Sequence, residues 1–239
     1  MNAHSKVQFE VIHDSMDKEA LSHETRVAII LSELVFFIPA DIKASYGLSE
    51  ENLKTVYFKG GQYHDVGKVA YRYSLFKTVK ESTCHTMFHI LRKHTIHGRD
   101  YLLEYADGLF ENDTEKTICT DMAMYHHERH DGHGCSEELA VFIPFAAQLC
   151  SVVNTFDNYV MESPFLLGKK YACQTAYEKT MSDTGLARQN VFDCFAAGKE
   201  LIFDKYCSKQ SVFRSAKMLD KERKISEEQQ RFVLSKQAE

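Results

Sequence analysis

Apolar residues recur at helical spacing through most of the chain, and few stretches show the alternation that is typical of strands. The clearest pattern lies between residues 15 and 37, where the apolar side chains share one face of a helix. These positions are Val27, Ile30, Leu31, Leu34 and Val35. The helix is expected to stop before Pro39, because the residue before a proline disfavours the α conformation. With only three prolines in 239 residues, the pattern predicts an all-α fold.

Capping residues and glycines predict where several further helices begin and end. Ser49 is a good N-cap, and Asn112 begins a second capping segment. The pair Gly60-Gly61 is expected to interrupt the helix after Ser49, and it indicates close backbone packing, a kink or a loop between two short helices. The other predicted helices cover residues 83–93, 101–109, a long segment that starts at Ile143-Pro144, 170–182 and 187–206.

The length and composition favour one main domain. A hydrophobic fraction of 44% suffices for a core, and we divide the chain into an N-terminal arm (1–14), a helical domain (15–206) and a charged helical extension (207–239). The first ten residues are compatible with either a loose arm or a short extended piece. No apolar stretch has the length of a membrane span, and the N-terminus lacks a signal core, so we expect a cytoplasmic protein without a membrane partner.

The net charge of −5 gives no support for binding to DNA. An acidic protein that binds an anionic ligand must supply local positive charge, and metal ions are one source of it.

Histidines and carboxylates form the candidate chemistry of the chain. His64-Asp65 places two metal-ligating side chains on neighbouring residues, and Lys68 follows one turn later. Glu19 and His23 are four residues apart and share a helix face, although a surface Glu–His pair would look the same.

Two later segments add to these candidates. His94 and His97 are three apart, so that one of them is a candidate ligand and the other a neighbour. The segment 126–134 holds four histidines together with Glu128, Arg129 and Asp131, which is a polar and glycine-rich composition unlike that of a core. Asn154 and Asp157 are polar positions three apart in a mostly apolar helix, which is costly unless they are paired or ligating.

Five segments in order resemble a known family. They are Ser22-His23-x-x-Arg26-Val27-Ala28, His64-Asp65-Val66-Gly67-Lys68, Lys93-His94-Thr95-x-x-Gly98, His126-His127-Glu128-Arg129-x-Asp131-Gly132-x-Gly134 and Ile143-Pro144-x-x-Ala147-Gln148, followed by Phe156-Asp157. Over roughly residues 15–195 the chain resembles the HD-GYP subgroup of the HD-domain metal-dependent phosphohydrolases. The resemblance implies a helical bundle with a polynuclear metal site between its helices.

The resemblance also implies a function and roles for individual residues. Family members hydrolyse cyclic di-GMP with two or three iron or manganese ions, through a metal-bridged hydroxide that attacks the phosphodiester. The implied metal ligands are Glu19, His23, His64, Asp65, His94, His126, His127 and Asn154. Lys68 matches the lysine over the scissile phosphate, and the implied catalytic residues are therefore Lys68 and Asp65. Glu128, Arg129, Asp131 and Asp157 are interpreted as residues that support the ligands or contact the substrate.

The chain departs from the family pattern at several positions. Asn154 replaces a ligand aspartate, Cys135-Ser136 replaces the Tyr-Pro of the G-Y-P motif, and 163–166 lacks the arginine and basic residue that hold phosphates. Lys169 and Lys170 are possible substitutes for these cations. Two functions stay open: a phosphodiesterase for a cyclic dinucleotide or another nucleotide, and a degenerate relative that binds metal, nucleotide or a partner protein without turnover. The loop 129–136 and the C-terminal helix are the candidate surfaces for a protein partner.

Overall fold

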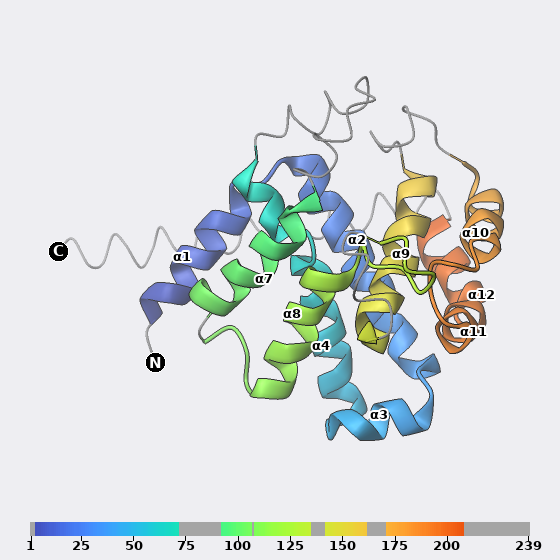
Figure 1. Cartoon of the computed structure of the whole chain (residues 1–239), viewed down its shortest axis with the longest axis horizontal. Coiled ribbons are helices and arrows are strands. Elements are labelled where there is room, and N and C mark those ends of the chain that lie inside the picture. The colour runs from blue at the N-terminus through green and yellow to red at the C-terminus, as the bar shows by residue number, and fades with distance from the viewer. Residues whose placement is uncertain (1–2, 72–91, 107, 135–141, 162–170, 208–239) are drawn as a thin grey trace. The chain divides into compact units, whose positions relative to one another are not determined.

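The protein is described by a computed structural model for residues 3–71, 92–106, 108–134, 142–161 and 171–207 (Figure 1). Across these ranges the chain forms helices and turns and no strand, so the predicted all-α fold is confirmed. The contacts divide the chain into two compact units, 1–198 and 199–239. No helix within these ranges has the length and apolar character needed to cross a membrane.

The first unit contains most of the regular structure. Its helices are α1 (Ala3–Asp14), α2 (Lys18–Leu34), α3 (Ala40–Tyr46), α4 (Glu50–Tyr63), α7 (His94–Tyr105), α8 (Asp113–Tyr125), α9 (Phe145–Val160), α10 (Cys173–Ser182) and α11 (Gln189–Ala197). Two 3-10 turns, η1 (Val35–Phe37) and η2 (Val66–Ala70), extend α2 and follow α4. In the second unit, α12 (Lys199–Ile202) continues into the π-helical turn η5 (Phe203–Cys207).

Four helices pack around the centre of the first unit. Helix α4 contacts α2 on one side and α8 on the other, and α9 contacts both α2 and α8 (Figure 1). Helix α7 packs against α8 and η2, while α10 and α11 pack against α9. The apolar faces of α2 and α9 are buried between these helices, as their spacing in the sequence predicts.

Several helix ends lie where the sequence predicts them. Ser49 caps α4, and its hydroxyl accepts a hydrogen bond from the Asn52 backbone N–H at 3.2 Å. Asn112 caps α8 in the same way through the Glu115 N–H at 2.9 Å. The helix that begins near residue 15 ends before Pro39, as predicted.

The predicted interruption at Gly60-Gly61 is wrong, because α4 runs through both glycines. The alternative interpretation, close backbone packing, is confirmed. A Cβ at Gly61 would lie 2.8 Å from the Ala28 backbone nitrogen, so only glycine lets α4 approach α2 this closely.

The N-terminal segment is helical rather than extended between Ala3 and Asp14. Phe9 is fully buried, and His13 Nε2 lies 2.9 Å from Glu24 Oε2 on α2. Several predictions concern residues outside the described ranges and stay predictions. They fall on most of the predicted helix 83–93, on residues 135–136 and 163–166, on Lys169 and Lys170, and on nearly all of the predicted extension 207–239.

Candidate metal centre

The centre is built where α4 ends. His64 is the C-terminal cap of α4, and Asp65 follows with φ −103° and ψ 5°, a region of the backbone map in which many active-site residues lie. Both residues are buried, with exposed fractions of 0% and 1%. The 3-10 turn η2 then brings Gly67 against the first turn of α7, which holds His94.

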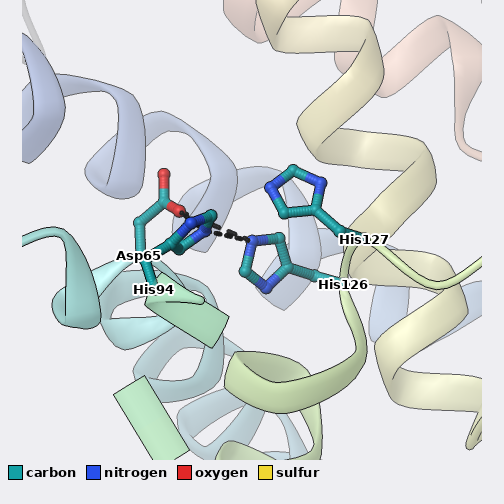
Figure 2. A group of neighbouring side chains, drawn as sticks. All are labelled: Asp65, His94, His126 and His127. Atoms are coloured by element: carbon teal, nitrogen blue, oxygen red, sulfur yellow. Dashed lines mark hydrogen bonds and ion pairs between the residues drawn. The ribbon is translucent and has the colours of Figure 1, made fainter. Parts of the chain in front are cut away.

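Asp65, His94, His126 and His127 form a first group of potential ligand atoms (Figure 2). Asp65 Oδ1 lies 3.1 Å from His94 Nε2 and 3.4 Å from His126 Nε2. The two Nε2 atoms of His94 and His126 are themselves 3.3 Å apart. The group therefore joins η2, the start of α7 and the end of α8 around one carboxylate oxygen.

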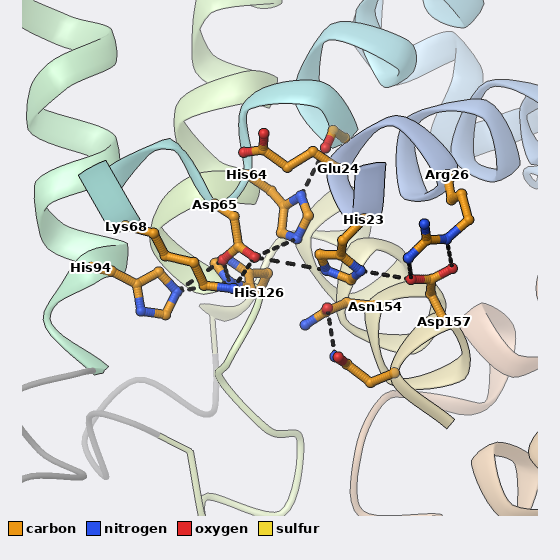
Figure 3. A network of polar contacts seen from close by, with 12 residues as sticks. His23, Glu24, Arg26, His64, Asp65, Lys68, His94, His126, Asn154 and Asp157 are labelled. Carbon is orange, nitrogen blue, oxygen red and sulfur yellow. Dashed lines mark hydrogen bonds and ion pairs between the residues drawn. The ribbon is translucent and has the colours of Figure 1, made fainter. Parts of the chain in front are cut away.

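His23, His64 and Asp65 form a second group on the other side of the same carboxylate (Figure 3). Here Asp65 Oδ2 lies 3.5 Å from His64 Nε2 and 3.7 Å from His23 Nε2. Helix α2 contributes His23 because its close packing against α4 brings the His23 side chain beside the end of α4. Asp65 is thus common to both groups, with a different oxygen nearer each.

Hydrogen bonds at Nδ1 fix the orientation of three imidazoles. His64 Nδ1 lies 2.7 Å from the Gly61 carbonyl oxygen, and His126 Nδ1 lies 3.0 Å from the Met122 carbonyl oxygen. Because a carbonyl only accepts, Nδ1 carries the proton in both rings and the Nε2 lone pair points toward Asp65. His23 Nδ1 donates in turn to Asp157 Oδ2 at 2.7 Å, with the same result.

The donor separations are compatible with shared metal ions. Ligands about 2.1 Å from an ion are separated by roughly 3.0–3.5 Å at right-angled or tetrahedral geometry, and the distances from Asp65 to the imidazoles fall in or near that range. His64 Nε2 and Asp65 Oδ1 are also buried without a hydrogen-bond partner. Buried polar atoms are normally satisfied, so these two atoms indicate an absent ligand. The residues present therefore fit a site for divalent cations.

The protonation states suit metal binding at neutral pH. Burial lowers the pKa of His64, His94 and His127, so these imidazoles are neutral and keep a free lone pair. Burial alone would raise the pKa of Asp65, but Lys68 and the surrounding histidines outweigh it and hold that pKa well below its usual range. Asp65 is therefore an ionised carboxylate.

Lys68 is the cation nearest the shared carboxylate among the described contacts, and its ammonium group forms an ion pair with Asp65 Oδ2 (Figure 3). The side chain of Lys68 is about one fifth exposed, at 18%. The structure thus brings Lys68 to the centre and places it on the oxygen nearer His23 and His64.

Asp157 is buried and supports His23 rather than standing beside the carboxylate of Asp65. Arg26 Nε and Nη2 donate to its two oxygens at 2.8 and 2.9 Å (Figure 3). Burial would raise the pKa of Asp157, but Arg26 and His23 together lower it to about 2. This carboxylate is therefore ionised, and it holds the His23 ring in one orientation.

Two other predicted ligands have different surroundings. Glu19 is exposed and lies outside both ligand groups, so the structure does not bring its carboxylate to the centre. Asn154 is buried, and its side-chain oxygen accepts a hydrogen bond from Asn158 Nδ2 at 2.9 Å. That bond uses one of the two lone pairs of the amide oxygen.

Ion pairs and hydrogen bonds of charged residues stabilise the loop 128–134, which follows His127. Arg129 donates to Asp131 at 2.8 Å and to both oxygens of Asp183 at 2.7 and 2.9 Å. The Asp131 backbone N–H donates to the Gly185 carbonyl at 3.0 Å, which ties this loop to the turn after α10. Arg129 and Asp131 therefore hold the loop, while Glu128 is buried beside Gly134.

The sequence pattern predicts no role for Arg26 or Asp183. Arg26 follows His23 by three residues within one motif, and a cation that close to a candidate ligand is the signal that could identify it. Asp183 had no such signal, because its partner Arg129 is 54 residues away.

The comparisons with known proteins add no family to this description. No protein-family model matches the chain, and a search of curated proteins finds no match to it.

Proposed function

We propose that the chain is a metal-dependent phosphohydrolase of the HD-domain type, which cleaves a phosphodiester of a cyclic dinucleotide or of another nucleotide. One observation carries the proposal: the oxygens of Asp65 lie nearest to two different sets of imidazoles, His94 with His126 and His23 with His64. A carboxylate shared in this way is suited to two neighbouring ions. The order of the sequence motifs supports the same family.

Two divalent ions in such a site would lower the pKa of solvent and stabilise the charge of a phosphoryl group. The residues of the chain supply the remaining requirements. His23, His64, His94, His126 and His127 would hold the ions together with Asp65. Neutral imidazoles and a carboxylate suit iron or manganese, the metals that the family resemblance implies.

The charge balance of the site favours an anionic substrate. Near the ligands, the negative charge of Asp65 is matched by Lys68 and that of Asp157 by Arg26. Two divalent ions would therefore leave the centre strongly positive, although the whole chain carries −5. A phosphodiester is an anion of this kind, and Lys68 is close enough to the centre to stabilise charge on it.

The test is hydrolysis by the purified protein with Mn²⁺ or Fe²⁺ under reducing conditions. Cyclic di-GMP, a linear dinucleotide and a chromogenic phosphodiester serve as substrates. We expect turnover by the wild type and a loss of about a hundredfold or more in His64→Ala and Asp65→Ala, because each removes an ion ligand. The matched control is His97→Ala, which removes a histidine of α7 outside both ligand groups and is expected to keep activity. Activity that survives Asp65→Ala, or is absent from the wild type on all three substrates, contradicts the proposal.

The state of Asn154 favours a second candidate, a relative that binds ligand without turnover. An amide oxygen is neutral, ligates more weakly than a carboxylate and here already accepts a hydrogen bond from Asn158. Calorimetric binding of a cyclic dinucleotide to the metal-loaded protein, together with no hydrolysis, would select this candidate. Asn154→Asp, which restores the family residue, would then be expected to produce turnover.

A further inference from the structure

The two oxygens of Asp65 have different partners. We call Asp65 with His94, His126 and His127 the first subsite, and Asp65 with His23 and His64 the second subsite. Oδ1, which is nearer the first subsite, has no hydrogen-bond partner although it is buried. Oδ2, which is nearer the second subsite, is engaged by the ammonium group of Lys68.

The donors of the two subsites also differ in number. The first subsite offers three imidazoles, and the second offers two. An ion in the first subsite would meet an oxygen that needs a partner, whereas an ion in the second would meet an oxygen that already has a cation. A divalent ion and an ammonium group cannot both lie against the same carboxylate oxygen without strong repulsion.

We propose that Lys68 competes with the second metal ion for Asp65 Oδ2, so that the second subsite fills only when the ammonium group moves off that oxygen. The proposal rests on the metal centre invoked in the proposed function and deepens it. Lys68 then has two positions, one on Asp65 when a single ion is bound and one away from it when both are bound. The released ammonium group lies beside the centre, where it can meet an anionic ligand.

The competition makes occupancy of the second subsite depend on Lys68 as well as on the metal concentration. The first subsite fills at low metal concentration with Lys68 still paired to Asp65. The second ion binds more weakly because it must break a charge-assisted hydrogen bond. Lys68 therefore sets the metal concentration at which the two-ion form appears.

The test is a titration of metal-free protein with Mn²⁺, followed through the electron paramagnetic resonance signal of the free ion. The wild type is expected to bind two ions with different dissociation constants. Lys68→Met keeps the length of the stem and removes the charge, and we expect it to bind the second ion about tenfold more tightly, with a much smaller change for the first. Lys68→Arg keeps the charge and is expected to resemble the wild type. His23→Ala lacks a ligand of the second subsite, so the binding step that disappears in this variant is the one that belongs to the second subsite.

The matched control is Lys43→Met. Lys43 forms an ion pair with Glu50 at 2.8 Å and is similarly exposed, at 24%, but belongs to neither subsite. It should leave both dissociation constants unchanged. The proposal is overturned if Lys68→Met leaves the second constant unchanged, weakens it, or tightens both constants equally, since an equal change is a general effect of charge.

Failure of this proposal is distinguishable from failure of the proposed function. Two-step binding that responds to Lys68→Met, without hydrolysis of any phosphodiester, supports the competition and contradicts the enzyme. If the protein hydrolyses a phosphodiester and binds two ions with constants that Lys68→Met does not change, the enzyme is supported and the competition is contradicted. If the wild type binds no Mn²⁺ at all, both proposals fall.

Discussion

At the scale of single residues, the candidate metal centre depends on the groups that orient each imidazole. His64 and His126 are held by helix carbonyls, which substitution of a side chain cannot remove. His23 is held by the side chain of Asp157, so its orientation is the one that mutation can change. Arg26 keeps Asp157 ionised in a buried position.

Substitution of Asp157 is therefore expected to affect one subsite only. In Asp157→Asn the neutral amide holds His23 less firmly, and binding at the second subsite should weaken by about tenfold to a hundredfold. The first subsite should change little, because none of its imidazoles contacts Asp157 in the described hydrogen bonds. A Mn²⁺ titration measures both constants. Equal weakening at both subsites would show that the substitution acts through the fold instead.

Asp121 on α8 gives a prediction for the dependence of stability on pH. Burial raises its pKa to about 6, whereas the unfolded value is 3.8. The folded state therefore binds this proton more tightly, and the contribution of Asp121 to the free energy of unfolding is lost as the pH rises from about 4 through 6. Asp121→Asn stays neutral and should raise the free energy of unfolding on the order of 1–2 kcal/mol at pH 7.5, and by little at pH 4. Urea unfolding of metal-free protein at the two pH values measures the difference.

Asp131 is the matched control, because its pKa is shifted in the opposite direction to that of Asp121. A hydrogen bond from Arg129 lowers its pKa to about 2, so its stabilising contribution is present above pH 3.8 and is lost as the pH falls toward 2. Asp131→Asn should therefore lower stability at pH 7.5. If Asp121→Asn and Asp131→Asn changed stability in the same direction at that pH, the account of both carboxyl groups would be wrong.

At the scale of elements, close approach between backbones places the ligands. A Cβ at Gly67 would overlap the carbonyl oxygen of His94 and the backbone nitrogen of Gly98, so only glycine lets η2 lie against α7. A Cβ at Gly98 would meet its nearest atom at 3.4 Å, which is ordinary contact. Two glycines in the same interface therefore differ sharply in the space around them.

Gly67→Ala is expected to separate Asp65 from His94. We predict a loss of about 1–3 kcal/mol in the free energy of unfolding, typical of overpacking, and weaker binding of the first ion. Gly98→Ala is the control and should leave stability unchanged or raise it slightly, because alanine favours a helix. Thermal unfolding with and without Mn²⁺ measures both effects. Equal behaviour of the two variants would contradict the packing argument.

The elements also show what the sequence can predict. Periodicity and capping residues predict α2, α4, α8 and α9, because these signals are local. Helix α3 is not among the predicted helices. The pattern predicts an interruption at Gly60-Gly61 because Ala28, the neighbour that requires glycine at position 61, is remote in the sequence. The motif order indicated which histidines meet. No local pattern indicates that Arg129 pairs with Asp183, or which oxygen of Asp65 lies nearer to each imidazole. Both depend on contacts between residues that are distant in the sequence.

At the scale of the whole molecule, the centre joins α2, α4, α7 and α8 of the first unit, so ion binding should stabilise that unit. An ion that binds only the folded state at about one hundred times its dissociation constant adds about 2.7 kcal/mol to the free energy of unfolding. For a protein of this size we expect a rise of about 5–10 °C in Tm with Mn²⁺. Calorimetry should show the rise in the wild type and in His97→Ala, and a smaller rise in His126→Ala, which lacks one ligand of the first subsite. If Mn²⁺ leaves the Tm of the wild type unchanged, a metal site formed by these helices is contradicted.

The central claim is that Asp65 lies between two metal ions. The most direct measurement is a crystal structure of the wild type loaded with Mn²⁺, with anomalous differences collected at the manganese edge. We expect two anomalous peaks, one within coordination distance of Asp65 Oδ1 and His94 and the other within coordination distance of Asp65 Oδ2 and His64. Peaks that lie elsewhere, or a manganese-loaded crystal without a peak beside Asp65, would contradict it.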